Sequence, residues 1–251
     1  LQPIADEAAL ALANARALTS RDLWQGKAVW HVIEAKGDWA PITPTGYLIE
    51  DTLSARVHPR HACAALVGAI RAKGGEVVSN GTSEGRVVWA TGVAGLHELS
   101  HAHTRSVGSG VKGQGALLAY DAANLPQIFA DTLHIIPHED GTTAIGSTTE
   151  NTYDDPTSTD AQLDAVIARA REAVPVLADA PVLERWADIR PRSRSRGPML
   201  GAHPLRVGEF IANGGFKIGF GMAPKIGQVM ADLVLDGVHS IPEAFRPEAS
   251  Y

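Results

Sequence analysis

A glycine-rich segment near the C-terminal end of the chain reads Asn213-Gly-Gly-Phe-Lys-Ile-Gly-Phe-Gly-Met-Ala-Pro-Lys-Ile-Gly-Gln228. Apolar residues then recur at helical spacing and Gly237 offers a C-cap, so we expect an amphipathic helix from about Pro224 to about Asp236. Proline is preorganised for the first helical position. Glycines allow close backbone approach, and a helix start presents unpaired N–H groups with a positive dipole end. The segment therefore predicts either an anion-binding loop or only a tight strand-to-helix turn.

The composition is that of an ordinary globular protein, with 45% hydrophobic residues, 20% charged residues and a formal net charge of −6 over 251 residues. This length allows one large domain or two small ones. Lysines and arginines are scattered, which indicates no nucleic-acid surface. The longest apolar runs, such as Ala62–Ile70, are too short to cross a membrane. Cys63 is the single cysteine and is expected to be buried in a helix. Because it has no disulfide partner, the chain fits a reducing, cytoplasmic compartment.

Helical and strand-like segments are mixed along the chain, which predicts an α/β or mixed α+β architecture. Helices are expected over Ile4–Leu18, over Arg60–Lys73, over Ala94–His101 and after a capping box at Thr159. Strands are expected over Tyr47–Ile49, Val77–Val78, Arg86–Ala90, Gly115–Tyr120, Leu133–Ile136, Thr142–Ser147 and Glu209–Ala212.

The segment His97-Glu98-Leu99-Ser100-His101 matches the zinc-protease pattern H-E-x-x-H, in which two imidazoles share a helix face and the glutamate acts as a base. A catalytic zinc needs a third protein ligand, usually shortly downstream, yet no Asp or Glu occurs between Glu98 and Asp121. His103 is offset from His101 by two residues and leaves the helical face. An exposed polar helix is therefore the preferred interpretation, and a zinc metallohydrolase is kept as an alternative.

The segment Gly108-Ser-Gly-Val-Lys-Gly113 matches the dinucleotide-binding pattern G-x-G-x-x-G. A Rossmann motif needs a helix after these glycines, whereas the residues up to Tyr120 look like a strand. Asp131 lies near the expected distance of the acidic residue but follows no second strand. We therefore expect a glycine-rich turn rather than a nucleotide site.

The run from Trp186 to Gly201 places arginines at every second position, namely Arg190, Arg192, Arg194 and Arg196. In an extended segment they would project to one side, where arginine forks bind carboxylates bidentately. The alternative is a solvated basic loop. Arg190 differs because Pro191 forces an extended local backbone. A partly buried arginine there would require an anionic partner.

Six segments occur in the order found in FAD-dependent oxidoreductases of the D-amino-acid oxidase (DAO) type, and the chain resembles most closely the glycine oxidase and amino-acid dehydrogenase branch. They are Arg56-Val-His-Pro59, Val87-Val-Trp-Ala-Thr-Gly92, Val111-Lys-Gly-Gln114, Ile135-Ile-Pro137 with Gly146-Ser-Thr148, Trp186–Pro191 with Gly197-Pro198 and Gly201, and Gly214–Gly227. The resemblance covers nearly the whole chain. It implies an α/β fold, mixed α+β in character, with a Rossmann-like FAD-binding domain and a mixed-sheet substrate domain.

The resemblance implies FAD as the cofactor. In such enzymes an Ala-Thr-Gly turn lies near the pyrophosphate and ribose of FAD, which points to Ala90, Thr91 and Gly92. The family's glycine loop passes along the flavin, and the helix after it directs its N-terminus to the pyrimidine end of the ring. The loop residues implied are Gly215, Phe216, Lys217, Ile218, Gly219, Phe220 and Gly221.

On the substrate side, the arginine of the family's Arg-Pro pair binds the substrate carboxylate, and here it is Arg190. The family often places a tyrosine over the substrate near the Ile-Ile-Pro strand, where this chain has His134. The implied reaction is oxidation of the C–N bond of a small amino acid or amine by hydride transfer to the flavin. No strong base is required when the amine arrives neutral, so the protein mainly positions substrate and cofactor. No metal site is expected.

The family begins with a strand–glycine loop–helix unit that binds the ADP half of FAD, and no matching motif occurs near Leu1. We therefore expect this chain to lack the N-terminal nucleotide-binding segment, and a missing segment or partner chain to complete the FAD site. Residues 53–93 and 185–245 are expected to form the FAD-binding part, and residues 1–52 and 94–184 the substrate domain. A non-catalytic subunit or remnant of a flavoenzyme is the second alternative. The electron acceptor is left open.

Overall fold

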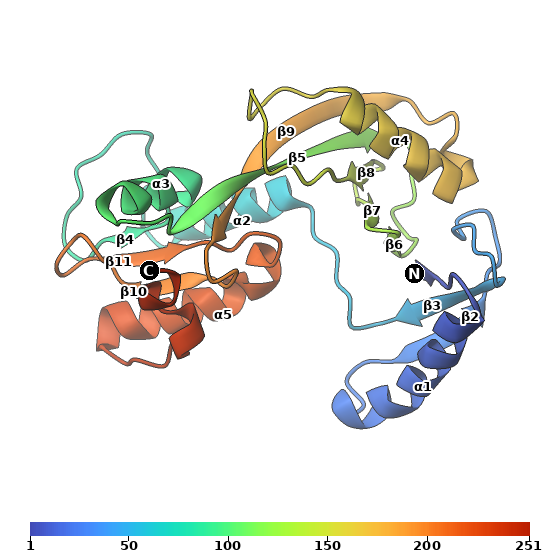
Figure 1. The fold of residues 1–251 in the computed structure, drawn as a ribbon, viewed down its shortest axis with the longest axis horizontal. Coiled ribbons are helices and arrows are strands. Elements are labelled where there is room, and N and C mark those ends of the chain that lie inside the picture. Colours follow the sequence, from blue (N-terminus) through green and yellow to red (C-terminus); the bar gives the residue numbers. More distant parts are fainter. The chain divides into compact units, whose positions relative to one another are not determined.

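A computed structural model describes every residue from Leu1 to Tyr251, and its helices and strands are mixed along the chain as the α/β prediction requires (Figure 1). Contacts divide the chain into two compact units, each assembled from three segments. Unit 1 comprises Leu1–Val77, Gln114–Thr148 and Ser158–Ala187. Unit 2 comprises Val78–Gly113, Thr149–Thr157 and Asp188–Tyr251. The division of the chain into an FAD-binding part and a substrate domain stays a prediction.

The larger sheet has the strand order β6-β7-β8-β5-β9. Its strands are β5 (Gly108–Leu118), β6 (Ile128–Ala130), β7 (Leu133–Pro137), β8 (Thr143–Gly146) and β9 (Val182–Ser193). In the predicted hairpin of β7 and β8, Ile135 lies opposite Ile145, and both belong to the main core of unit 1. Helix α4 (Ala161–Ala173) adds the apolar stripe Leu163, Val166, Ile167 and Ala170 to that core.

The cap of α4 is Asp160 rather than the expected Thr159, because the Asp160 carboxylate accepts a hydrogen bond from the backbone N of Gln162 at 2.9 Å. Helix α1 (Glu7–Leu23) likewise begins later than the expected Ile4. Its cap is Asp6, whose side chain accepts from the backbone N of Ala9 at 2.7 Å. Both corrections have one cause, since a short carboxylate that reaches the first free N–H groups sets where a helix starts.

A second, antiparallel sheet of unit 1 has the order β1-β3-β2, with β1 (Gln2–Pro3), β2 (Trp30–Glu34) and β3 (Tyr47–Asp51). Helix α1 is tied to it by a hydrogen bond of 3.1 Å from Trp30 Nε1 to the carbonyl oxygen of Ala13. The predicted strand over Tyr47–Ile49 is thus confirmed, whereas Val77–Val78 forms no strand.

Helix α2 (Pro59–Ala72) agrees with its prediction within one residue and begins after the cap residue His58. None of its residues is buried, and Leu66 and Ile70 are 63% and 46% exposed. Cys63 is exposed as well, so the expectation of a buried cysteine is wrong. The physical reason is that the apolar face of α2 is left uncovered, although its sequence is that of a helix that packs on a core.

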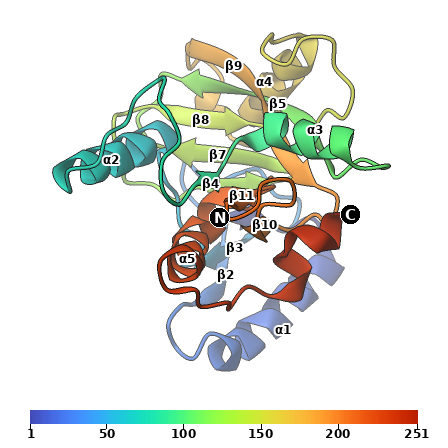
Figure 2. The same ribbon diagram turned by 90° about the vertical axis from the view of Figure 1, so that its left-hand side faces the viewer.

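Unit 2 is built round a sheet of order β10-β11-β4, formed by β4 (Val88–Trp89), β10 (Met199–Ala202) and β11 (Phe210–Asn213). β11 runs parallel to β4 and antiparallel to β10. Side chains alternate across a strand, so Met199 and Ile211 pack with helix α3 (Gly92–Ala102), while Leu200 packs with helix α5 (Gly219–Ala231). Figure 2 shows the two helices on opposite sides of this sheet.

Helix α5 begins at Gly219, well before the expected Pro224, so the proline lies inside the helix. Proline has no N–H to donate to the carbonyl four residues earlier, which costs the helix one hydrogen bond. The helix continues as a π-helical turn, η2 (Asp232–Asp236), and ends at Gly237 with a φ of 71°. The predicted end and glycine cap are therefore confirmed.

The segment Gly108–Gly113 is not the expected turn but the first half of strand β5. Glycine inside a strand marks a place where another group approaches closely. A Cβ at Gly108 would lie 2.7 Å from the carbonyl oxygen of Arg192, and one at Gly110 would lie 2.7 Å from Tyr153 Oη.

The remaining elements are the 3-10 turns η1 (Pro175–Leu177), η3 (Glu243–Phe245) and η4 (Pro247–Ser250). No helix has both the length and the apolar character needed to cross a bilayer.

Candidate functional site

The predicted Ala90-Thr91-Gly92 turn follows the carboxyl end of β4 and leads into α3, whose first residue is Gly92. Gly92 has a φ of 57°, a backbone conformation that favours glycine. Asn213 Nδ2 donates to the carbonyl oxygen of Gly92 at 2.8 Å, which ties this turn to the end of β11. Because β4 and β11 are parallel neighbours, the Ala-Thr-Gly turn and the segment after β11 meet at one edge of the sheet.

The glycine loop, Gly215–Gly221, follows β11 at this edge. It contacts the end of β9 through an antiparallel bridge between Arg192 and Gly215 and a hydrogen bond of 3.0 Å from Phe216 N to the carbonyl oxygen of Pro191. Lys217 Nζ donates to Thr149 Oγ1 at 3.0 Å. Unit 2 therefore joins the glycine loop directly to the Arg-Pro segment, two motifs that are separate in the sequence.

Arg190 lies on β9 and is half-buried. Its Nη1 is 3.4 Å from the carbonyl oxygen of Lys112 on β5, and a Cβ at Gly113 would overlap its guanidinium. Burial lowers the pKa of Arg190 below its ordinary value, and the nearby Glu150 carboxylate opposes that shift. An arginine keeps its charge at any physiological pH, so Arg190 carries a positive charge that is partly desolvated. Gly113, which has no side chain, leaves the space that this guanidinium occupies.

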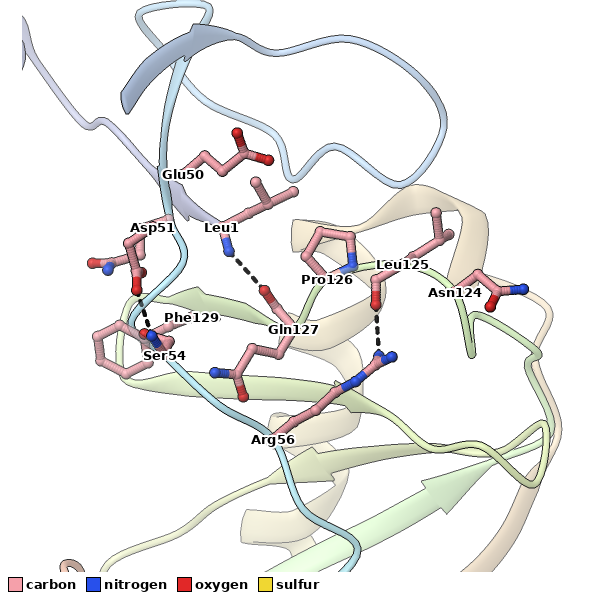
Figure 3. A pocket seen from close by; sticks show the side chains of 11 residues that line it. Leu1, Glu50, Asp51, Ser54, Arg56, Asn124, Leu125, Pro126, Gln127 and Phe129 are labelled. Carbon is pink, nitrogen blue, oxygen red and sulfur yellow. Dashed lines mark hydrogen bonds between the residues drawn. The ribbon is translucent and has the colours of Figure 1, made fainter. Parts of the chain in front are cut away.

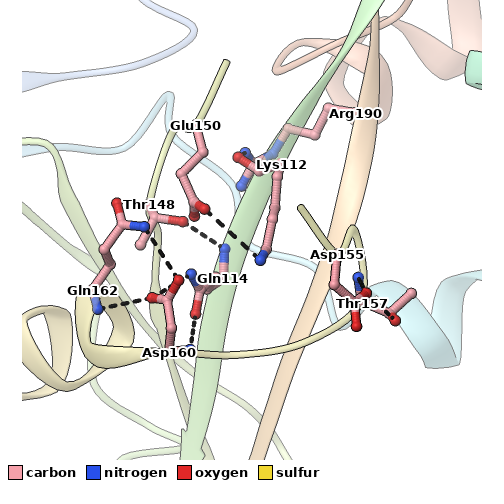
Figure 4. Close-up of polar contacts among 9 residues, drawn as sticks. All are labelled: Lys112, Gln114, Thr148, Glu150, Asp155, Thr157, Asp160, Gln162 and Arg190. Atoms are coloured by element: carbon pink, nitrogen blue, oxygen red, sulfur yellow. Dashed lines mark hydrogen bonds and ion pairs between the residues drawn. The ribbon is translucent and has the colours of Figure 1, made fainter. Parts of the chain in front are cut away.

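Two further charged residues lie beside Arg190 (Figure 4). Lys112 Nζ is 3.8 Å from Glu150 Oε2, and the two residues are only 3% and 8% exposed. Their backbones exchange two hydrogen bonds of 2.9 Å. We call Lys112, Glu150 and Arg190 the charge cluster. The cluster therefore brings two cations and one carboxylate together in a largely desolvated part of unit 2.

The sequence does not mark Lys112 and Glu150 as site residues. A lysine on a strand usually faces solvent, and no local pattern distinguishes the buried Lys112 from an exposed one. The one sequence feature that sets Lys112 apart is its position in the Val111-Lys-Gly-Gln114 segment. It lies next to Gly113, which makes room for Arg190.

The groups at this sheet edge fit the implied FAD. Helices α3 and α5 both begin there, and neither has a side-chain hydrogen bond capping its first N–H groups. A helix start of this kind favours an anion such as a pyrophosphate. At Gly219 and Gly221 a Cβ would meet no atom within 4 Å, so the backbone is open to a bound group. The residues present therefore suit a dinucleotide with Thr91 and Gly92 at one helix start and the glycine loop at the other.

His134, the other predicted substrate-side residue, lies in unit 1. It is exposed on β7, opposite Phe129 of β6 and Gly146 of β8. Its ring packs against that of Phe129 with a centroid distance of 4.6 Å. A role of His134 over the substrate stays a prediction.

The H-E-x-x-H segment lies on α3, where His97, Glu98 and His101 are exposed. Glu98 forms an ion pair with Arg206. The Arg206 guanidinium thus binds the Glu98 carboxylate, which a zinc hydrolase would use as its base. The arrangement therefore disfavours the metallohydrolase alternative and agrees with the interpretation of a polar helix.

Local sequence patterns do not predict the surface cavities, and each unit has one that is lined in part by charged residues. In unit 1, a cavity of about 370 Å³ lies between the N-terminal residues and the loop before β6, and its lining includes Leu1, Glu50, Asp51, Arg56 and Gln127 (Figure 3). Arg56 Nη1 there donates to the carbonyl oxygen of Leu125 at 2.6 Å. In unit 2, a cavity of about 490 Å³ is lined by Arg105, Ser109, Arg192, Arg194 and Arg196, among others. The expected one-sided row of arginines ends at Arg192, because β9 stops at Ser193 and the chain turns.

Comparison with protein families matches residues 4–233 to the family model DAO, described as FAD dependent oxidoreductase. The chain is 36% identical over 125 residues to a glycine oxidase of Pseudomonas aeruginosa, a match that covers 49% of this chain and 34% of that protein. A glycine oxidase of Bacillus licheniformis is 26% identical over 215 residues, which cover 76% of this chain and 58% of the relative. The chain thus spans less than two thirds of the length of these relatives.

Among solved structures, iminodiacetate oxidase from Chelativorans sp. BNC1 superposes with a TM-score of 0.84 over 98% of this chain and 74% of that one. The sequence identity is 18%, so this likeness concerns the fold. It covers both units of the present chain.

Proposed function

This chain belongs to the DAO family of FAD dependent oxidoreductases, and we propose that it oxidises the C–N bond of a small amino acid or amine. The observation that carries the proposal is the hydrogen bond of 3.0 Å between Phe216 N and the carbonyl oxygen of Pro191. It links the loop assigned to the flavin to the strand that holds Arg190. The glycine oxidases among the relatives support an amino-acid substrate.

Arg190 binds the substrate carboxylate in this proposal. Its guanidinium fork suits bidentate recognition of a carboxylate, and its partial burial strengthens that interaction by excluding water. The pair of Lys112 and Glu150 fixes the backbone of β5 at this point. The carbonyl oxygen of Lys112 there accepts a hydrogen bond of 3.4 Å from Arg190 Nη1. The charge cluster therefore positions the carboxylate, and with it the α-carbon.

The chain's own residues act mainly by binding and orientation. FAD, when bound, supplies the acceptor for the hydride that leaves the α-carbon. Thr91, Gly92 and the glycine loop provide backbone N–H groups at the two helix starts, and these favour negative charge. The amine reacts in its neutral form, so no side chain of the charge cluster is required as a base.

A reconstitution experiment tests this function. Purified protein is incubated with FAD, freed of excess cofactor and mixed without oxygen with glycine, other small amino acids and N-substituted glycines. We expect flavin absorbance to remain with the protein and to bleach with at least one of these compounds. Bound flavin that no amine or amino acid reduces would contradict the proposed reaction.

The role of Arg190 is tested by Arg190→Ala. Loss of a charged hydrogen bond costs about 1.5–3 kcal/mol, which weakens binding of carboxylate ligands by about 10- to 150-fold. Arg194→Ala is the matched control, because Arg194 lies in the exposed turn after the same strand. Equal affinities for both variants and the unchanged protein would remove Arg190 from the site.

A second candidate function is that of a non-catalytic subunit or remnant, whose FAD site is completed by a further segment or a partner chain. One observation favours it. The apolar face of α2 is uncovered, with Leu66 and Ile70 largely exposed. A further segment or a partner chain that packs there would bury this face. Protein that stays colourless after incubation with FAD, and gains flavin only when a longer chain or partner is supplied, supports this candidate over the self-sufficient enzyme.

A further inference from the structure

Unit 1 contains a cluster of metal-ligand side chains that the proposed function does not use. His58 directly precedes α2, and His138 and Asp140 lie in the turn between β7 and β8. One ligand atom from each residue lies within 4.8 Å of the other two. We call these three residues the histidine cluster. Two segments far apart in the sequence thus bring two imidazoles and one carboxylate together.

The carboxylate of Asp140 is oriented by its own turn. Its Oδ1 accepts hydrogen bonds from the backbone N of Thr142 at 3.1 Å and from Thr142 Oγ1 at 2.6 Å. Its Oδ2 is directed to the other side, 3.6 Å from Nε2 of His58. That separation is longer than a hydrogen bond, so Oδ2 and the imidazole face each other without closing on one another.

The ring of His138 is oriented by the same hydroxyl. Its Nδ1 lies 3.3 Å from Thr142 Oγ1. Because that hydroxyl gives its hydrogen to Asp140, it accepts from Nδ1–H of His138, which leaves the lone pair on Nε2. A ligating histidine usually donates its other ring N–H to an oxygen in this way. Thr142 therefore orients two of the three candidate ligands at once.

His58 is held between two other rings. It stacks on His61 at a centroid distance of 3.8 Å and lies 4.1 Å from the ring of His138. Its Nδ1 accepts a long hydrogen bond of 3.4 Å from the backbone N of His61. A bond of that length is weak, so the stacked rings rather than this hydrogen bond set the position of the His58 imidazole.

We propose that the histidine cluster binds a divalent transition-metal ion, with Zn²⁺ the best match, through one ring nitrogen each of His58 and His138 and a carboxylate oxygen of Asp140. Two imidazoles and a carboxylate are a zinc ligand set, and a water completes the tetrahedron. Tetrahedral zinc with bonds of about 2.0–2.1 Å places its ligand atoms about 3.3 Å apart, so the present spread of up to 4.8 Å closes by about 1.5 Å at most. Most of that closure falls to Asp140, which lies on an exposed turn, while the hydrogen bond at His58 Nδ1 is weak.

The ion ties the start of α2 to the β7–β8 turn. α2 buries none of its own residues, so such a link anchors a helix that packing holds poorly. An ion that binds the folded chain and not the unfolded one raises the midpoint of thermal unfolding, here by about 5–10 °C at a hundredfold excess over the dissociation constant.

The test uses Zn²⁺ on the purified chain after treatment with a chelator. Isothermal titration and dialysis followed by elemental analysis are expected to give one ion per chain with micromolar or tighter affinity, and the thermal midpoint is expected to rise. Asp140→Asn keeps the shape of an exposed side chain while it removes the charged ligand, and it should weaken zinc binding at least tenfold. Neither measurement depends on flavin, so failure of this site and failure of the oxidoreductase function are distinguishable.

His101→Ala is the matched control, because it removes a histidine of the H-E-x-x-H segment on α3 and leaves the histidine cluster intact. It should retain zinc. Loss of zinc in His101→Ala, unchanged zinc affinity in Asp140→Asn, or no stoichiometric binding by the unchanged chain would each overturn the proposal. Because His138 is buried, His58→Ala is the second ligand variant, and circular dichroism checks that both ligand variants fold.

Discussion

The charge cluster and the histidine cluster gather charged or polar groups by opposite means. In the charge cluster, Lys112 and Glu150 are almost fully buried, and paired backbones hold their side chains 3.8 Å apart. In the histidine cluster, Asp140 is exposed on a turn, and its Oδ2 lies 3.6 Å from a histidine whose side chain is mostly covered. The separations are similar, yet the surroundings of the two pairs differ.

The difference has consequences for energy and for adaptability. Buried charges lose their hydration and persist only while every partner is present. A group on an exposed turn keeps water as an alternative partner and moves at little cost. The charge cluster is therefore suited to hold one geometry for a substrate, whereas the histidine cluster is suited to close around an ion.

The largest expected effect concerns stability. Lys112→Met removes one cation of the buried pair and leaves Glu150 with Arg190 as the remaining cation of the cluster, which should lower the free energy of unfolding by about 1.5–3 kcal/mol. Asp140→Asn, measured with a chelator present, should change it by less than about 0.5 kcal/mol, as is usual for exposed positions. Urea unfolding of both variants measures the contrast. Equal losses would show that burial does not separate the two clusters.

A smaller effect is expected from Gly113→Ala. The added Cβ overlaps the Arg190 guanidinium and displaces it without removing its charge. We expect kcat/KM for carboxylate substrates to fall about 10- to 100-fold, because a displacement near 1 Å is enough to misplace the reacting atoms. Steady-state kinetics of the flavin-loaded protein measure this change.

Gly227→Ala is the control for that variant. Gly227 lies inside α5, where a Cβ meets nothing within 4 Å. It should keep its activity and gain about 0.5–1 kcal/mol of stability from the better helix former. If Gly113→Ala behaves like this control, the guanidinium is not confined as described.

The smallest expected effect concerns acid, at His203, a buried histidine of unit 2 that belongs to neither cluster. Burial and the nearby Arg206 lower the pKa of His203, while Glu98 and Glu209 oppose the shift. Since the unfolded value is about 6.5, stability is fully present above that pH and is lost as pH falls through the lower folded pKa. Protonation would also break the hydrogen bond of 3.2 Å that His203 Nδ1 accepts from Leu205 N.

His203→Asn keeps an acceptor for Leu205 N but cannot titrate. Thermal unfolding between pH 7.5 and pH 5.5 should therefore show a shallower loss for this variant than for the unchanged chain. Parallel curves would mean that His203 does not contribute to acid sensitivity.

Local patterns predicted the elements whose signals are themselves local. The helix α2, the β7–β8 hairpin and the cap at Gly237 depend on spacing and turn residues within one segment, and they appear as expected. Predictions failed where a distant group decides the outcome. Gly108–Gly113 looks like a turn because glycines favour turns, but its glycines make room in a strand for Leu96, Tyr153 and Arg190.

The sequence alone was sufficient for the α/β class, the DAO family and FAD, because ordered motifs and residue periodicity carry that information without any contact being known. The tertiary structure creates three contacts that residue spacing does not predict. They are the hydrogen bond between the glycine loop and Pro191, the buried Lys112–Glu150 pair beside Arg190, and the proximity of His58 to His138 and Asp140. The reason is physical. Burial and proximity arise between segments that are distant along the chain, and they alone turn an ordinary lysine or histidine into part of a site.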